Sequence, residues 1–191
     1  MGKGRLEAFS DGVLAIIITI MVLEIKVPKG HSISDLQPLL PIMLSYLLSF
    51  AYVGIYWNNH HHMFHAVHKV NGGVMWLNLL LLFSLSLFPF ATAWVGESEF
   101  SKWPVIIYGV VLLMAAFSYF FLSQCLISIH GKDSTLAKAI GKDKKGIISL
   151  VFYISGIAAS FVSPLLGFTL YAIVACIWFL PDRRIEKVIG N

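Results

Sequence analysis

The stretch that decides the fold lies near the N-terminus and has the sequence RLEAFSDGVLAIIITIMVLEIK, residues 5–26. Its central twelve residues, 12–23, carry no charge, and charged side chains flank them on both sides: Arg5, Glu7, Asp11, Glu24 and Lys26. Twelve helical residues cover about 18 Å, whereas crossing the hydrocarbon core of a bilayer takes about 20 residues. Charged groups this close to the core usually face protein or water. The stretch therefore predicts a helix that is enclosed in a protein assembly and touches water at both ends, as a pore-lining helix does.

The composition assigns the chain to the integral membrane proteins. Of its 191 residues, 58% are hydrophobic and only 13% are charged, which is too few charges for a soluble domain of this size. Four long segments contain no Asp, Glu, Lys or Arg: 36–68, 70–96, 103–131 and 146–181. Each is long enough to cross a bilayer, so little of the chain is left for a domain outside the membrane.

We expect one all-α domain over residues 1–191 with six transmembrane helices. The last charge-free segment is longer than one span needs, and Pro164 lies near its middle, where a proline ends or kinks a helix. We therefore divide it into two short helices. The predicted helices cover residues 6–27, 34–58, 73–94, 103–129, 146–162 and 163–181.

The distribution of basic residues supports six spans with both termini in the cytoplasm. In this topology eleven basic residues lie inside: Lys3, Arg5, Lys69, Lys132, Lys138, Lys142, Lys144, Lys145, Arg183, Arg184 and Lys187. Three lie outside: Lys26, Lys29 and Lys102. Cytoplasmic loops carry an excess of Lys and Arg, so this asymmetry favours six spans over five, which would give a weaker bias. The basic loop 131–145 is expected to contact lipid headgroups or to fix topology.

The first helix carries an aliphatic stripe. At 100° per residue, Ile16, Ile20 and Leu23 fall within about 60° of one another, and Thr19 flanks them. Such a stripe can pack against neighbouring helices, as in most membrane bundles, or it can line a pore. The short charge-free run keeps the second interpretation open.

The same segment resembles a known family. Arg5-x-x-x-Phe9-Ser10-Asp11, followed by an isoleucine- and leucine-rich helix, is similar to the signature of the transmembrane protein 175 family of potassium channels. The resemblance extends to six spans and to Trp57-Asn58-Asn59-His60-His61 near the end of the second predicted helix. It implies that a single-repeat chain like this one forms a homotetramer around a central pore lined by the first helix.

In the resembling family, bulky aliphatic side chains of the first helix form the pore constriction, which maps onto Ile16, Ile20 and Leu23, with the hydroxyl of Thr19 beside them. A narrow apolar ring holds no stable water column and gates by dewetting. The resemblance thus implies a potassium-permeable cation channel with modest preference for K⁺ over Na⁺, because the chain has no TVGYG filter. It also implies that Arg5, Phe9, Ser10 and Asp11 act as a scaffold, hydrogen-bonded to Trp57 and His61. From its position inside the third predicted helix, Asn78 needs a polar partner, and the signature group is a candidate.

Five histidines crowd one region: His60, His61, His62, His65 and His68. The spacing of His61, His65 and His68 places them on one helical face, so they are weak candidates for a metal site. A metal-dependent, lipid-modifying enzyme would need more histidine boxes than the chain contains, and no nucleotide-binding or hydrolase motif is present. We therefore expect neither an enzyme nor a cofactor.

The expected partners are three further copies of the chain, membrane lipid and monovalent cations, with K⁺ as the permeant ion and no nucleic acid. The expected location is the inner membrane of a prokaryotic cell. The competing hypothesis is a secondary, ion-coupled transporter with its coupling site around Asp11, which would require broken helices near the middle of the bilayer.

Overall fold

The structure, a computed structural model, describes residues 2–141 and 143–179, and the elements in these two ranges are all helical. They are α1 (Lys3–Leu23), the 3₁₀ helix η1 (Ile33–Leu39), α2 (Leu40–His65), α3 (Gly72–Ser86), α4 (Phe88–Glu97), α5 (Lys102–His130), α6 (Thr135–Ile140), α7 (Lys144–Ser160) and α8 (Pro164–Phe179). The all-α fold predicted from the sequence is confirmed.

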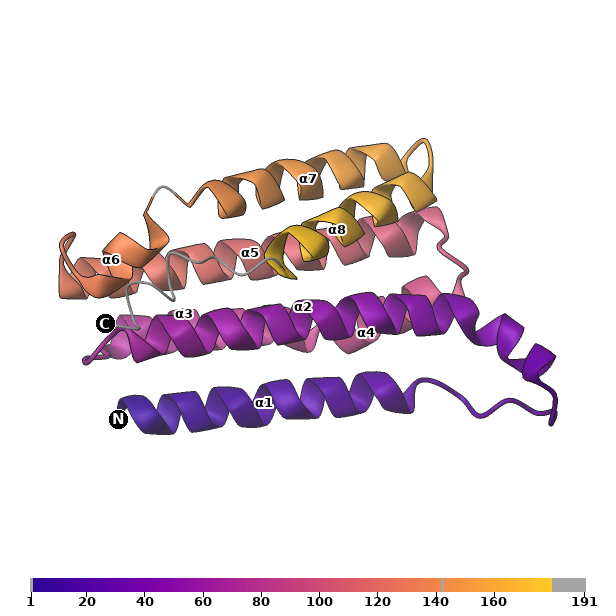
Figure 1. Ribbon diagram of the computed structural model, residues 1–191, viewed down its shortest axis with the longest axis horizontal. Helices are drawn as coiled ribbons and strands as arrows, with labels where there is room; N and C mark the ends of the chain where they lie inside the picture. Colours follow the sequence, from indigo (N-terminus) through magenta and orange to yellow (C-terminus); the bar gives the residue numbers. More distant parts are fainter. Residues whose placement is uncertain (1, 142, 180–191) are drawn as a thin grey trace.

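The long helices form an antiparallel bundle whose ends alternate along the chain (Figure 1). The N-terminus, the end of α2, the start of α3, the end of α5 and the start of α7 gather at one end of the bundle. The loop between α1 and η1, the start of α5 and the α7–α8 turn gather at the other. Helix α1 lies along one edge, where it contacts α2, α3 and α4. One side of α1 is therefore packed and the rest is uncovered in the single chain.

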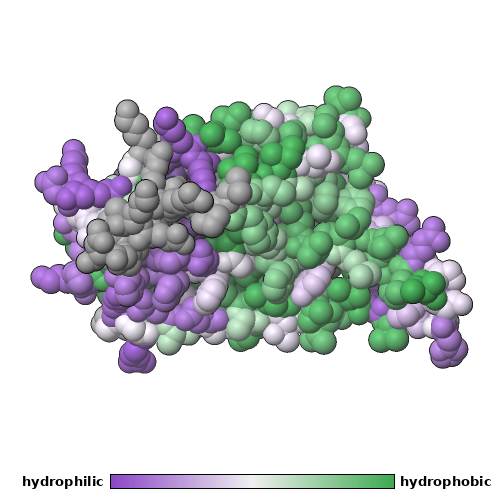
Figure 2. Space-filling model, viewed as in Figure 1, coloured by the Kyte–Doolittle hydropathy of each residue, from purple (hydrophilic) through white to green (hydrophobic). Residues whose placement is uncertain are grey.

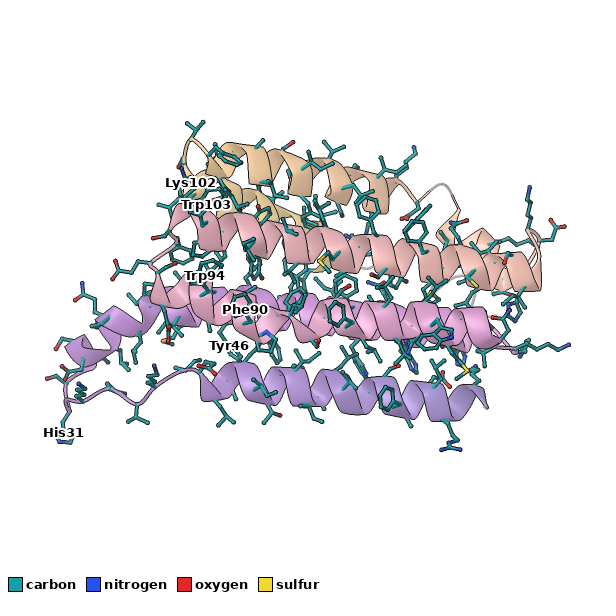
Figure 3. All side chains as sticks on the ribbon, turned by 180° about the vertical axis from the view of Figure 1, so that it is seen from behind. His31, Tyr46, Phe90, Trp94, Lys102 and Trp103 are labelled. Atoms are coloured by element: carbon teal, nitrogen blue, oxygen red, sulfur yellow. The ribbon has the colours of Figure 1, made fainter. Side chains whose placement is uncertain are left out.

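On the face shown in Figure 2, a broad apolar band crosses the middle of the bundle and hydrophilic residues collect at both ends. Four segments are long and apolar enough to cross a membrane: Lys3–Leu23, Ile33–His65, Gly72–Glu97 and Lys102–His130. Helix α8 is a shorter apolar helix. At the end away from the N-terminus, Trp94 and Trp103 lie near Lys102, whose Nζ is 5.7 Å from the Trp103 ring centroid (Figure 3). Tryptophan rings prefer the boundary between lipid and water. Together with the apolar segments, their position shows that the chain is an integral membrane protein.

Helix α1 differs in both of its ends from the predicted 6–27. It begins at Lys3 and ends at Leu23, so it has 21 residues and a length of about 32 Å. The earlier end follows from Pro28, which lacks an N–H and disfavours helical geometry at Val27. The charged residues at its start are therefore part of the helix, and α1 is long enough to cross a bilayer although its charge-free run is not.

Helix α2 continues to His65, seven residues beyond the predicted end at Asn58. Prolines 38 and 41 lie in η1 and the first turn of α2, where proline is tolerated. The extension was missed because histidine and asparagine residues are poor signals of a membrane span. It places the first four histidines of the cluster on the helix.

The predicted helix 73–94 is two helices, α3 and α4, divided at Leu87. Pro89 causes the division, because it cannot donate to the carbonyl four residues earlier and its ring collides with that carbonyl. The backbone remains paired at the break: the Leu87 N–H donates to Ser84 O and the Ala91 N–H donates to Leu87 O. Hydropathy alone misses this kink because the apolar run is continuous.

Helices α7 and α8 pack closely through small residues. Their turn at residues 161–163 lies next to Pro164, the first residue of α8. A Cβ added at Gly156 would collide with the Tyr171 ring, and one added at Gly167 would collide with the Ser160 side chain. Small residues allow membrane helices to approach this closely.

The short helix α6 in the basic loop was not predicted from the sequence. Some residues of the predictions lie outside the described residues: 180–181 of the predicted last helix, Lys142, Arg183, Arg184 and Lys187.

The glycine contact between α7 and α8 gives a stability prediction. Gly156→Ala is expected to lower the free energy of unfolding by about 1–3 kcal/mol, because the buried Tyr171 ring cannot yield without repacking. Gly54→Ala is the matched control, since a Cβ there meets no atom within 4 Å. It should be neutral or slightly stabilising because alanine favours a helix over glycine. The measurement is SDS titration of the purified proteins followed by circular dichroism, and equal destabilisation of both variants would contradict the prediction.

Candidate functional site

The packed face of α1 is set by residues spaced three or four positions apart. Leu6, Ser10, Leu14, Ile17 and Met21 are buried, each with 3% or less of its surface exposed. This spacing follows one side of an α-helix. The four apolar members belong to the hydrophobic core, and Ser10 is the one polar residue among them. The face toward α2, α3 and α4 is therefore apolar except at Ser10.

Ser10 ends a chain of hydrogen bonds that joins α1, α2 and α3. The Asn78 Nδ2 group donates to Ser10 Oγ at 2.9 Å, and Ser10 Oγ donates to Leu6 O at 2.9 Å. His60 Nε2 lies 2.8 Å from Asn78 Oδ1. Because Asn78 Oδ1 is an acceptor, His60 Nε2 is the donor of this bond. The side chains of Ser10, Asn78 and His60 are at most 3% exposed, so the chain is sealed from solvent and paired at each link.

A second contact joins the signature to α2 at the surface. The Trp57 Nε1–H donates to Asp11 Oδ1 at 3.0 Å, and both side chains are exposed. His61 stacks on Trp57 with ring centroids 6.3 Å apart. Among the described residues, His60 reaches the signature by hydrogen bonds through Asn78, while the role of His61 in the scaffold stays a prediction. Neighbouring positions on a helix are 100° apart, so only one of the two can face α3 and α1.

Arg5 and Phe9 do not join this buried cluster. Both are exposed, Phe9 with 53% of its surface uncovered. Within the described residues, the Arg5 side chain makes no hydrogen bond or ion pair. The structure therefore divides the signature into two pairs: Ser10 and Asp11 contact other helices, and Arg5 and Phe9 lie on the uncovered side of α1.

A hydroxyl cluster holds the other half of α1 and was not predicted from the sequence. Thr92 Oγ1 lies 3.8 Å from Met21 Sδ and 2.6 Å from Ser49 Oγ, which in turn lies 2.9 Å from Tyr108 OH. These buried groups link α1 to α2, α4 and α5. The available signal was the presence of hydroxyl residues inside apolar segments, which commonly hydrogen-bond between membrane helices.

The loop between α2 and α3 ties the start of α1 to the end of α5. Lys3 Nζ donates to Val67 O at 3.0 Å. The backbone N–H groups of His68 and Lys69 both donate to His130 Nε2 at 3.2 Å. His130 Nδ1 lies 2.9 Å from Leu126 O, so the ring is neutral with its proton on Nδ1. The N-terminal end of α1 is thus anchored to the body of the bundle.

The predicted constriction residues lie on the uncovered face of α1. Ile16 is 59% exposed, Ile20 is 43% exposed and Leu23 is 74% exposed. Thr19 is also exposed, and its hydroxyl donates to Ala15 O of its own helix at 2.9 Å. Residues 2–141 and 143–179 leave these large apolar side chains largely uncovered. They face either lipid or further copies of the chain.

The histidine cluster does not form the predicted common face. Helix α2 ends at His65, so His68 lies in the following loop instead of one turn further along the helix. His61 and His65 stack with ring centroids 6.1 Å apart. Over residues 2–141 and 143–179, no group of three or more His, Cys, Asp or Glu side chains is arranged to hold a metal ion.

Known proteins with this pattern are channels. A family model described as the endosomal/lysosomal potassium channel TMEM175 matches residues 5–89, which include the signature, Trp57 and Asn78. A potassium channel of Chryseobacterium sp. (strain P1-3) is 57% identical over 187 residues, covering 98% of this chain and 97% of that protein. The chain belongs to the TMEM175 family. The resemblance inferred from Arg5, Phe9, Ser10 and Asp11 is confirmed, and the family is one of channels and not of enzymes.

Two further TMEM175 relatives match this chain over different shares of their length. The solved structure of a lysosomal potassium-selective channel TMEM175 homologue from Chamaesiphon minutus has a TM-score of 0.80 and 33% identity, covering 95% of this chain and 97% of that one. The human endosomal/lysosomal proton channel TMEM175 is 35% identical over 116 residues, which are 54% of this chain and 23% of that protein. The chain therefore has the TMEM175 channel fold.

The buried hydrogen-bond chain predicts a large cost for losing its centre. Asn78→Leu is expected to destabilise the protein by about 1–3 kcal/mol for each of the two partners left unpaired, Ser10 and His60. Asn58→Leu, at an exposed position of α2, is the control and should change little. The double variant Asn78→Leu/His60→Phe should recover part of the loss, because it replaces both partners of one bond by apolar groups. The measurement is the same SDS unfolding titration, and an unaltered Asn78→Leu protein would contradict the prediction.

The surface contact predicts a milder, assembly-related effect. Asp11→Ala removes the acceptor for Trp57 Nε1 and is expected to lower the yield of assembled protein more than it alters ion preference. Asp11→Asn keeps an oxygen acceptor at the same place and should retain most of the yield. Size-exclusion chromatography gives the yield, and liposome flux gives the ion preference. A well-assembled Asp11→Ala protein with altered selectivity would show that Asp11 acts on the ions themselves.

Proposed function

We propose that the protein is a potassium-permeable cation channel whose pore is formed by the α1 helices of a homotetramer. The single observation that carries this proposal is the pair of faces on α1: one face is pinned to its own subunit by Ser10, Asp11 and Met21, and the other presents exposed Ile16, Ile20 and Leu23. The bacterial relatives are named potassium channels, which supports K⁺ as the permeant ion.

The exposed face of α1 points away from its own subunit, as it would if it lined an axis between four copies. By the helical angle of 100° per residue, Gly12, Ile16, Thr19 and Leu23 lie within about 60° of the direction opposite the buried stripe, and Ile20 lies about 100° from it, at the edge of the exposed face. A helix held by its own subunit on one side presents this opposite direction to an axis that four copies surround. A helix that faces only lipid gains nothing from a glycine and a threonine on that side. Arg5 lies on the same stripe, and at the mouth of a pore its charge would meet water.

The chemistry of the stripe supports gating by dewetting and modest selectivity. Isoleucine and leucine side chains from several copies would form narrow apolar rings in which a water column is unstable. Partial dehydration at such rings favours K⁺ over Na⁺ modestly, because the larger ion holds its water less strongly. The exposed Thr19 lies between Ile16 and Ile20 in the sequence, and its hydroxyl oxygen keeps free lone pairs while its O–H donates to Ala15 O.

The topology we propose has six crossings with both termini in the cytoplasm of a prokaryotic cell, in its inner membrane. The alternating directions of the long helices support it, including α7 and α8, whose 17 and 16 residues span about 26 and 24 Å (Figure 1). Seven described basic residues belong to the N-terminal end of the bundle: Lys3, Arg5, Lys69, Lys132, Lys138, Lys144 and Lys145. The opposite end has Lys26, Lys29 and Lys102, which agrees with a positive-inside orientation.

The competing transporter hypothesis has one observation in its favour, the break between α3 and α4. Broken helices in transporters expose backbone groups to bound ions. Here the Leu87 and Ala91 N–H groups are hydrogen-bonded within the chain, and Phe88 and Leu85 beside them are at most 1% exposed. The one exposed hydroxyl beside the break, Ser86, also donates within its own helix, to Phe83 O at 2.7 Å. These pairings favour a structural kink over an ion-coupling site.

The decisive test is a polar substitution at the proposed constriction. Ile16→Asn is expected to raise K⁺ flux into liposomes by about tenfold, the factor produced by lowering a barrier by about 1.4 kcal/mol, because an amide keeps the neck wet. The measurement is flux of K⁺, Na⁺ and H⁺ through purified protein, since the animal relatives are named proton channels.

Ile154→Asn is the matched control for this test. Ile154 lies on α7 with 57% of its surface exposed, against 59% for Ile16, and it is not part of the proposed pore. Its substitution should leave flux per assembled protein unchanged. Equal flux for Ile16→Asn, Ile154→Asn and the unaltered protein would contradict the assignment of α1 to the pore, and H⁺ flux without K⁺ flux would contradict the proposed ion.

A further inference from the structure

A cavity of about 670 Å³ lies on the side of the bundle away from α1. Its walls come from α2, α5 and α7, with Trp178 of α8 and the α6 region completing it. The deep part is aromatic, with Tyr52, Tyr56 and Tyr153. The volume falls within the range of about 300–1,000 Å³ typical of small-molecule sites. Nothing in the channel function proposed above uses this cavity.

The cavity has an apolar rim toward the membrane. Phe120, Phe121 and Ile147 line it and are 42%, 51% and 59% exposed. These side chains belong to the apolar segments of α5 and α7, so the opening lies beside lipid and not beside bulk water. A dry apolar cavity of this size loses packing contacts along its walls. An acyl chain is the apolar molecule available at this place.

A basic loop lies at the outer end of the cavity. Lys132 and Asp143 both line the cavity. The described residues of the 131–145 loop hold four lysines, Lys132, Lys138, Lys144 and Lys145, against two aspartates, Asp133 and Asp143. The Asp143 carboxylate caps α7, where Oδ1 accepts from the Gly146 N–H at 3.1 Å. Lys145 Nζ lies 5.7 Å from the ring centroid of Trp178, which is a wall of the cavity. The cavity is thus largely apolar inside, and the loop at its mouth has two more lysines than aspartates.

We propose that this cavity binds an anionic phospholipid, with one acyl chain between α5 and α7 and the phosphate at Lys132 and the neighbouring lysines. The cavity and the loop at its mouth match the two-part chemistry of such a lipid: an apolar surface for the acyl chain, and an excess of lysines in the loop for the headgroup. Basic pockets between transmembrane helices on the cytoplasmic side recognise anionic headgroups in this way.

The same turns of α2 line the cavity and hold the first helix. Tyr56 and Asn59 line the cavity, while Trp57 and His60, the residues that follow each of them, bond to Asp11 and Asn78. A lipid in the cavity therefore packs against the segment that holds α1. Binding itself is measured without ion flux, so its result is independent of the proposed channel function.

The test is native mass spectrometry of the purified protein with dioleoyl phosphatidylglycerol or dioleoyl phosphatidylcholine added. We expect one tightly retained phosphatidylglycerol per chain and weaker retention of phosphatidylcholine. Ala116→Phe fills the cavity and should weaken retention about tenfold, whereas Ala158→Phe, at an exposed position of α7 outside the cavity, should leave it unchanged. Lys132→Gln should remove much of the preference for the anionic lipid, and Lys29→Gln, in a distant loop, should not.

Three results would overturn this assignment. Equal lipid retention by Ala116→Phe and Ala158→Phe would place the lipid elsewhere on the surface. Retention of oleate but not of phosphatidylglycerol would identify a free fatty acid as the occupant. A lower oligomer mass in Ala116→Phe with an unchanged lipid count would identify the cavity as a contact between subunits. The same spectra report all three quantities, and a variant that fails to fold is recognised by its loss of the assembled species.

Discussion

The buried hydrogen bonds from His60 through Asn78 to Ser10 are the constraint on which the arrangement of the first helix depends. Hydrocarbon offers no water to replace a lost partner, so polar side chains inside a membrane bundle must find one another. The requirement is met in one rotation of α1 relative to α2 and α3, because a turn by one residue moves Ser10 about 100° away from Asn78. The position of the exposed stripe follows from that rotation.

The two ends of α1 are held by different chemistry. Near its start, an ammonium group bonds to a loop carbonyl and a carboxylate accepts from an indole N–H. Near its end, the soft thioether of Met21 meets a hydroxyl cluster. Just beyond this end, Lys26 Nζ lies 3.4 Å from Glu97 Oε1 at the end of α4. Both ends of α1 are therefore tied to the bundle.

Prediction from the sequence succeeded where the signal was local. The turn before α8 was predicted from Pro164, and the signature that includes Asp11 identified the family. Hydropathy did not predict the helix break at Leu87, because the apolar run continues through Pro89. The sequence also did not reveal the bond between His60 and Asn78, since spacing along one helix does not show where the other helices stand.

The sequence by itself determined that the chain is a membrane bundle and that one side of α1 is aliphatic, because hydropathy and helical period are properties of contiguous residues. Only the tertiary structure decided which polar groups meet and where a cavity remains. Ser10 and Asn78 are 68 positions apart, and Tyr56 and Lys132 line one cavity from different helices and loops. Such neighbours are created by the packing of helices against one another, which no single segment encodes.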